Sequence, residues 1–180
     1  GPFTMAAAVD AIAELADACP APARLCGLSL GASVALAVAA AHPDVVDRVV
    51  ASAPAIDGAR HPRVTAVYRR APGWALRRLT DLPDRAGWLS FVDEIAALDL
   101  TDELPKIDAR TLVLCGGRDR ANLAEAKLAG QAIPNGTFYL VPHVGHTWPV
   151  TQPKLFATVI RAFLTASVRD DTLTDDDPTS

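Results

Sequence analysis

Apolar residues recur along the chain in two alternating patterns: short continuous runs, and longer stretches with helical spacing. The runs have the length of buried strands and cover residues 23–28, 48–54, 111–116 and 137–142. Helical spacing predicts helices over 5–16, 35–42 and 122–130, and a C-terminal helix with one apolar stripe made of Leu155, Phe156, Val159, Ile160, Phe163 and Leu164. Strands that alternate with helices indicate a parallel sheet covered on both faces. The sequence therefore predicts one α/β domain over 5–168, with a mostly parallel sheet flanked by helices.

Three segments stand outside this alternation. Residues 1–4, GPFT, are expected to be the remnant of a cleaved tag in front of Met5. Residues 169–180 are acidic and are expected to be disordered. The long stretch 57–105 separates two strands and contains amphipathic patterns together with Trp74 and Trp88. Because a long insertion of this kind is more often functional than idle, we predict a helical cap over the strand ends.

The charge pattern narrows the function classes. A formal net charge of −4 gives no reason to expect nucleic acid or an anionic membrane as a partner. No apolar stretch reaches the length that spans a membrane. A cluster of arginines in the insertion is most simply a solvated face, with a carboxylate- or phosphate-binding site as the alternative; it comprises Arg60, Arg63, Arg69, Arg70, Arg77 and Arg78.

The three cysteines show no metal-binding spacing. Cys26 and Cys115 lie inside apolar strand-like runs, so both are predicted to be buried free thiols. This usage suits a reducing cytoplasm. No metal, nucleotide or flavin cofactor is expected.

The stretch Gly27-Leu28-Ser29-Leu30-Gly31 follows the first predicted strand and precedes a helix. It matches the G-x-S-x-G nucleophile elbow, in which a serine occupies a strained turn and projects above the sheet. The residues two positions away on each side must then be small, so that strand and helix can pass. The alternative, which involves no catalysis, is that Ser29 caps the N-terminus of the helix.

A nucleophilic serine needs a base, and the base needs an orienting carboxylate. Asp119 follows the third strand and His146 follows the fourth, and parallel strands share one carboxyl-terminal edge. Asp119 could instead cap the next helix; Asp57 is the alternative acid and His143 the alternative base. His42 and His61 each precede a proline and are expected to be surface or turn residues.

The motifs GLSLG, CGGRD and IPNGTFYLVPHVGH, followed by a helix ending in AFL, occur in this order. The chain resembles the C-terminal two-thirds of an α/β-hydrolase fold enzyme. The resemblance implies that Ser29 is the nucleophile, Asp119 the acid and His146 the base, and that the backbone N–H of Leu30 is one oxyanion donor. It also implies a small-molecule acyl substrate. The expected reaction is hydrolysis of an ester, thioester or related acyl bond, with acyl transfer as an alternative.

The chain departs from the family pattern at its start. The family opens with further strands, and a loop after an early strand supplies the second oxyanion donor; no such segment precedes residues 23–28. The strand at 23–28 should therefore lie at an exposed sheet edge, which is a template for pairing. We expect it to be covered in a homodimer or by a partner chain. The same departure motivates another hypothesis, a weakly catalytic or non-catalytic binding or assembly subunit.

Overall fold

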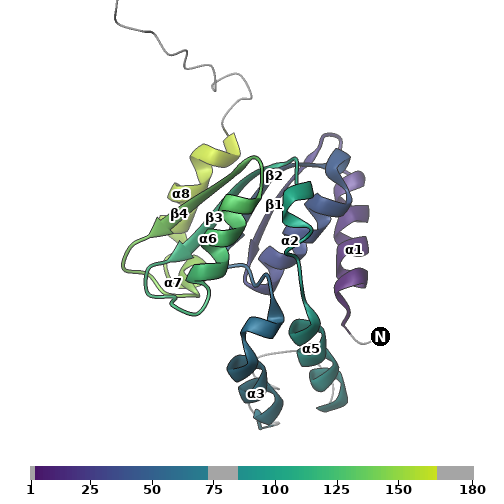
Figure 1. The fold of residues 1–180 in the computed structure, drawn as a ribbon. Helices are drawn as coiled ribbons and strands as arrows, with labels where there is room; N and C mark the ends of the chain where they lie inside the picture. The colour runs from purple at the N-terminus through teal and green to yellow at the C-terminus, as the bar shows by residue number, and fades with distance from the viewer. Residues whose placement is uncertain (1–2, 73–84, 166–180) are drawn as a thin grey trace, which may run out of the picture.

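The computed structural model describes residues 3–72 and 85–165 as a four-stranded sheet flanked by helices (Figure 1). The strands are β1 (Ala23–Leu28), β2 (Val46–Ser52), β3 (Arg110–Gly116) and β4 (Gly136–Val141). The α-helices are α1 (Met5–Asp17), α2 (Leu30–Ala41), α3 (Pro62–Arg70), α5 (Arg85–Ala97), α6 (Leu123–Ala132), α7 (Trp148–Thr151) and α8 (Pro153–Thr165). Short 3₁₀ turns occupy η1 (Pro43–Val45), η2 (Gly58–Arg60) and η3 (Leu104–Lys106). The predicted α/β class is confirmed.

All strand pairs are parallel and follow chain order, β1-β2-β3-β4. The carboxyl ends of the strands therefore meet at one edge, where the loops after β1, β3 and β4 begin. Within the described residues β1 pairs only with β2, so it lies at the edge of the sheet. Several predictions concern residues that the structure does not describe. These residues are 1–2 of the expected tag remnant, Trp74, Arg77, Arg78 and the acidic tail at 169–180.

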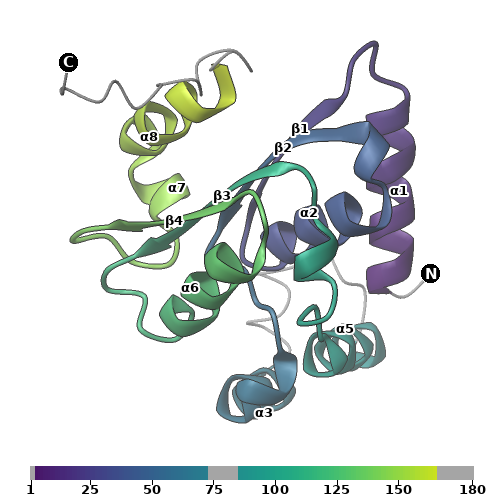
Figure 2. The same cartoon turned by 45° about the horizontal axis from the view of Figure 1, so that its top comes forward.

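The two faces of the sheet bury separate apolar clusters. Alternate strand residues point to opposite faces, so Val49 and Val113 join one cluster while Val50 and Leu114 join the other. Helices α1, α2 and α6 cover the first face, and α7 and α8 cover the second (Figure 2). The predicted stripe of the C-terminal helix packs against the second cluster, except that Leu155 is exposed.

Cys26 was predicted to be buried, and this is wrong: its side chain is exposed. The run that contains it is an edge strand with a partly exposed, alternating pattern, because no described strand flanks β1 on its outer side. Cys115, on the central strand β3, is buried as predicted.

Helices α3 and α5 of the insertion lie together, away from the sheet (Figure 1). Trp88 holds them to each other, since its Nε1 donates a hydrogen bond to the Tyr68 carbonyl at 2.7 Å and its ring contacts those of Tyr68 and Phe91. The insertion returns to the main core at Leu98, Leu100 and Leu104, which are buried in the first cluster. In the described part of the chain no helix is long and apolar enough to cross a membrane.

Candidate active site

Ser29 stands at a sharp corner between β1 and α2. Its backbone has φ 56° and ψ −122°. Residues other than glycine rarely adopt a positive φ, because their Cβ atom clashes with the backbone. A residue held in this way costs about 1–3 kcal/mol and is typical of functional sites. The Ser29 side chain makes no capping hydrogen bond to α2, so the helix-capping alternative does not describe it. The corner is held to the neighbouring strand β2, because the Ser29 N–H donates a hydrogen bond to the Ser52 carbonyl oxygen at 2.8 Å.

The two glycines around Ser29 are not equivalent. A Cβ atom on Gly27 would lie 2.2 Å from the Gly31 carbonyl oxygen, so strand and helix pass too closely for any side chain at Gly27. A Cβ atom on Gly31 would meet nothing within 4 Å. The expectation that both positions must be small therefore holds for Gly27 and is wrong for Gly31.

Asp119 and His146 form a bonded pair at the ends of β3 and β4. His146 Nδ1 lies 2.7 Å from Asp119 Oδ2, and the Asp119 side chain is buried while that of His146 is 37% exposed. Asn122 Nδ2 donates to the other carboxylate oxygen, Oδ1, at 2.8 Å. Because Asp119 accepts the imidazole N–H at Nδ1, the neutral ring keeps its lone pair on Nε2, as a general base requires.

In the described structure, neither the alternative acid, Asp57, nor the alternative base, His143, is bonded to the candidate site residues. Asp57 caps the turn η2 by accepting from Ala59 N–H and pairs with Arg60 Nε at 2.9 Å. His143 is exposed, with φ 64°. Neither residue takes part in the Asp119–His146 pair.

The loop that carries His146 packs closely against the end of β3. A Cβ atom on Gly116 would lie 2.5 Å from the Val144 carbonyl oxygen, and Arg118 N–H donates to that same oxygen at 2.9 Å. Just beyond His146, the buried Trp148 donates from Nε1 to Ser52 Oγ at 3.1 Å. These contacts hold the end of β2 and the loops after β3 and β4 together.

Ser29, Asp119 and His146 line one cavity of about 510 Å³. Leu30 lines it too; as the first residue of α2, its N–H has no acceptor within the helix. The insertion supplies a mostly apolar wall made of Val64, Tyr68, Trp88, Phe91 and Ile95. In the described structure Ser29 Oγ makes no hydrogen bond to His146, and such contacts often tighten only when substrate binds.

The model of the alpha/beta hydrolase family matches residues 1–159 of this sequence. The chain belongs to the alpha/beta hydrolase family. The enol-lactonase from Burkholderia xenovorans LB400 has a similar structure, with a TM-score of 0.74 at 25% identity, over 92% of this chain and 75% of that chain.

Two curated relatives of this alpha/beta hydrolase match over shorter stretches. A protein from Bacillus subtilis (strain 168) is 33% identical over 67 residues, which are 37% of this chain and 24% of that protein. It is named as a 2-succinyl-6-hydroxy-2,4-cyclohexadiene-1-carboxylate synthase. A protein named carbamate hydrolase RutD, from Pseudomonas syringae pv. syringae (strain B728a), is 29% identical over 87 residues, 48% of this chain and 34% of that one. The matched part thus spans about a quarter and a third of these relatives.

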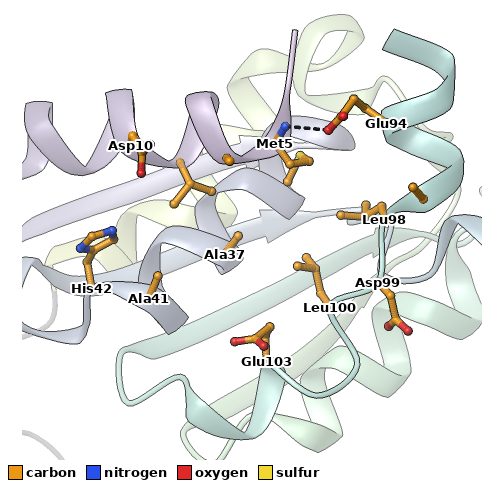
Figure 3. A pocket seen from close by; sticks show the side chains of 13 residues that line it. Met5, Asp10, Ala37, Ala41, His42, Glu94, Leu98, Asp99, Leu100 and Glu103 are labelled. Carbon is orange, nitrogen blue, oxygen red and sulfur yellow. Dashed lines mark hydrogen bonds between the residues drawn. The ribbon is translucent and has the colours of Figure 1, made fainter. Parts of the chain in front are cut away.

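A second hollow of this alpha/beta hydrolase, of about 460 Å³, lies between α1, α2 and α5 (Figure 3). Acidic residues line it, and Glu94 accepts a hydrogen bond from Met5 N–H at 3.0 Å. None of Ser29, Asp119 and His146 reaches this hollow. The cavity at the sheet edge is therefore the candidate active site.

The thiol of Cys115 also lies near Asp119, with its Sγ 3.8 Å from the Asp119 carbonyl oxygen. Burial, together with the negative charge of Asp119, raises the pKa of its thiol to about 12. The thiol is protonated at neutral pH and is not a nucleophile. Among the described residues, no three His, Cys, Asp or Glu side chains are grouped so that they could hold a metal ion.

Sequence reasoning missed two partners in this region. Asn122, which holds Asp119, follows it by three residues, so its spacing was a usable signal. His61 lies between η2 and α3, as a surface or turn residue would, but its ring bonds the buried Glu125 at 2.7 Å. These two residues are 64 positions apart, and nothing in the local sequence relates them.

Proposed function

We propose that this protein is a serine hydrolase that cleaves an ester, thioester or related acyl bond. Ser29 is the nucleophile, His146 the general base and Asp119 the residue that orients the imidazole. The observation that carries this proposal is the strained backbone of Ser29 in the same cavity as the Asp119–His146 pair. A strained serine whose hydroxyl does not cap its helix is better explained by nucleophilic catalysis than by helix stability.

In the proposed reaction, Ser29 Oγ attacks the acyl carbon while His146 Nε2 takes its proton. Asp119 stabilises the imidazolium that forms, and the Leu30 N–H donates to the developing oxyanion. The imidazolium then protonates the leaving group, and the acyl-enzyme forms. Water, deprotonated by His146, releases the acid and restores Ser29. If another nucleophile accepts the acyl group in place of water, the same residues perform acyl transfer.

The substrate is proposed to be small and partly apolar, since aromatic and aliphatic side chains of α3 and α5 form much of the cavity wall. The name of the structural neighbour from Burkholderia xenovorans supports an acyl bond, because a lactone is a cyclic ester.

The test is hydrolysis of p-nitrophenyl esters of increasing acyl length by the purified protein, with Ser29→Ala as the control. We expect saturable turnover that is strongest for short or medium chains and is abolished in the variant. Turnover that persists unchanged in Ser29→Ala would contradict the proposal.

One observation favours a second candidate, a binding or assembly subunit. The strand β1 leads into Ser29, and its outer edge has no described partner strand. We propose that a second copy of the chain, or a partner chain, covers this edge, because an open edge is a template for pairing. Light scattering at high concentration should give a molar mass above that of one 18.9 kDa chain. A monodisperse monomer would contradict this coverage.

A further inference from the structure

A second histidine–carboxylate pair lies on the wall of the candidate active site. His61, at the base of α3, lines the same cavity as Ser29 and His146. Its Nε2 lies 2.7 Å from Glu125 Oε1, and its side chain is 20% exposed while that of Glu125 is 5% exposed. The proposed mechanism uses neither residue.

An ionised carboxylate only accepts hydrogen bonds, so His61 is the donor when it pairs with Glu125. Glu125 Oε2 accepts the backbone N–H of Ile56 at 2.7 Å, so the carboxylate is already an acceptor for the loop after β2. The other oxygen accepts from His61 Nε2, which leaves Nδ1 of the neutral imidazole as a lone-pair acceptor. Within the described structure Nδ1 makes no hydrogen bond.

The helix α6 connects this pair to the candidate triad. Asn122, immediately before α6, holds Asp119, and Glu125, in the first turn of α6, holds His61. One rigid element thus places both histidines along one cavity.

The remaining lining indicates which ligand group His61 suits. No lysine or arginine is among the described residues that line the cavity, and Asp119 is the acidic residue there. Among these described lining residues, a carboxylate or phosphate on the substrate would meet no lysine or arginine. The lining of the cavity is mostly apolar, so an unpaired acceptor on His61 favours a neutral hydrogen-bond donor.

We propose that His61 is a specificity-determining residue, which accepts at Nδ1 a hydrogen bond from a hydroxyl or N–H group of a neutral substrate, and that Glu125 is its positioning residue. This proposal rests on the proposed function for the reaction, but the binding contact itself does not require turnover. A cavity with such an acceptor disfavours an otherwise equal substrate that has no donor, because Nδ1 is then desolvated without a partner.

The kinetic test compares matched p-nitrophenyl esters: hexanoate, its 3-hydroxy and 6-hydroxy derivatives, and the corresponding methoxy compounds, which lack the donor. We expect wild-type kcat/KM to favour one hydroxy ester over its methoxy partner by about tenfold, mainly through KM. His61→Leu should remove this preference, so that the ratio of kcat/KM between the hydroxy ester and its methoxy partner falls to about one, because leucine offers no acceptor. His61→Gln, which retains an acceptor and a donor, should restore part of the preference, and His42→Gln, outside this cavity, should keep all of it.

A binding measurement separates this proposal from the proposed function. In Ser29→Ala protein, which does not turn over ester, the ¹⁵N shift of His61 Nδ1 should change when the favoured hydroxy ester is added and stay constant with its methoxy partner. The proposed function fails if no ester is hydrolysed by wild type. The role of His61 is overturned if its Nδ1 shift is unaffected by every hydroxy ester, or if His61→Leu lowers all esters equally, as a purely structural contact would.

Discussion

Replacing His146 with alanine, or Asp119 with asparagine, is expected to lower kcat for ester hydrolysis by about 10⁴-fold. Alanine removes the only proton acceptor that we assign to Ser29. Asparagine keeps the size of the side chain, but its amide can donate to Nδ1, which puts the imidazole proton on Nε2 and removes the base. The losses should appear in kcat more than in KM, because neither residue is needed to bind the apolar part of the substrate.

The matched control for these variants is His143→Asn. His143 is three residues from His146, but it is exposed and has a positive φ, which asparagine tolerates. Its kcat should stay within about twofold of wild type, since surface changes of this kind have small effects. Equal losses in His143→Asn and His146→Ala would mean that the loop, and not the His146 imidazole, is what activity requires.

Gly27→Ala is expected to cause the largest loss of stability of any single-methyl addition at this corner. The new Cβ would lie 2.2 Å from the Gly31 carbonyl oxygen and 2.5 Å from the Ala32 nitrogen, both backbone atoms that no rotamer change can move. Strand and helix must separate, and we expect the free energy of unfolding to fall by about 2–4 kcal/mol. Thermal and urea unfolding, followed by circular dichroism, measure this loss.

Gly31→Ala is the matched control, because the same methyl group there meets nothing within 4 Å. Gly31 is in the first turn of α2 and has no positive φ, so alanine should leave the free energy of unfolding unchanged or raise it by up to about 1 kcal/mol. If Gly27→Ala and Gly31→Ala have equal stability, the close passage of β1 and α2 at Gly27 is wrong.

The grouping of the candidate site residues at one sheet edge was predictable because chain order and sheet geometry coincide here. Ser29, Asp119 and His146 each follow a predicted strand, and parallel strands bring such positions to one edge. The preference for Asp119 over Asp57 also had a local signal, because Asp119 stands two residues after the Gly116-Gly117 pair at the end of β3. The central strands β2 and β3 were also visible in the sequence, because burial on both faces makes them nearly continuous apolar runs.

What was missed depends on contacts between distant segments. The exposure of Cys26 follows from which strand lies at the edge, and a run of apolar letters does not distinguish an edge strand from a central one. The His61–Glu125 pair depends on how the insertion sits against α6. The open space at Gly31 likewise depends on what packs beside α2, whereas the motif treats both glycines alike.

Covalent labelling with a fluorophosphonate, read by intact mass and peptide mapping, tests most directly whether Ser29 is an activated nucleophile. We expect one adduct per chain, located on Ser29, absent in Ser29→Ala and formed much more slowly in His146→Ala. Folded protein that takes up no label, or takes it up at a residue other than Ser29, would contradict the assignment of Ser29 as an activated nucleophile.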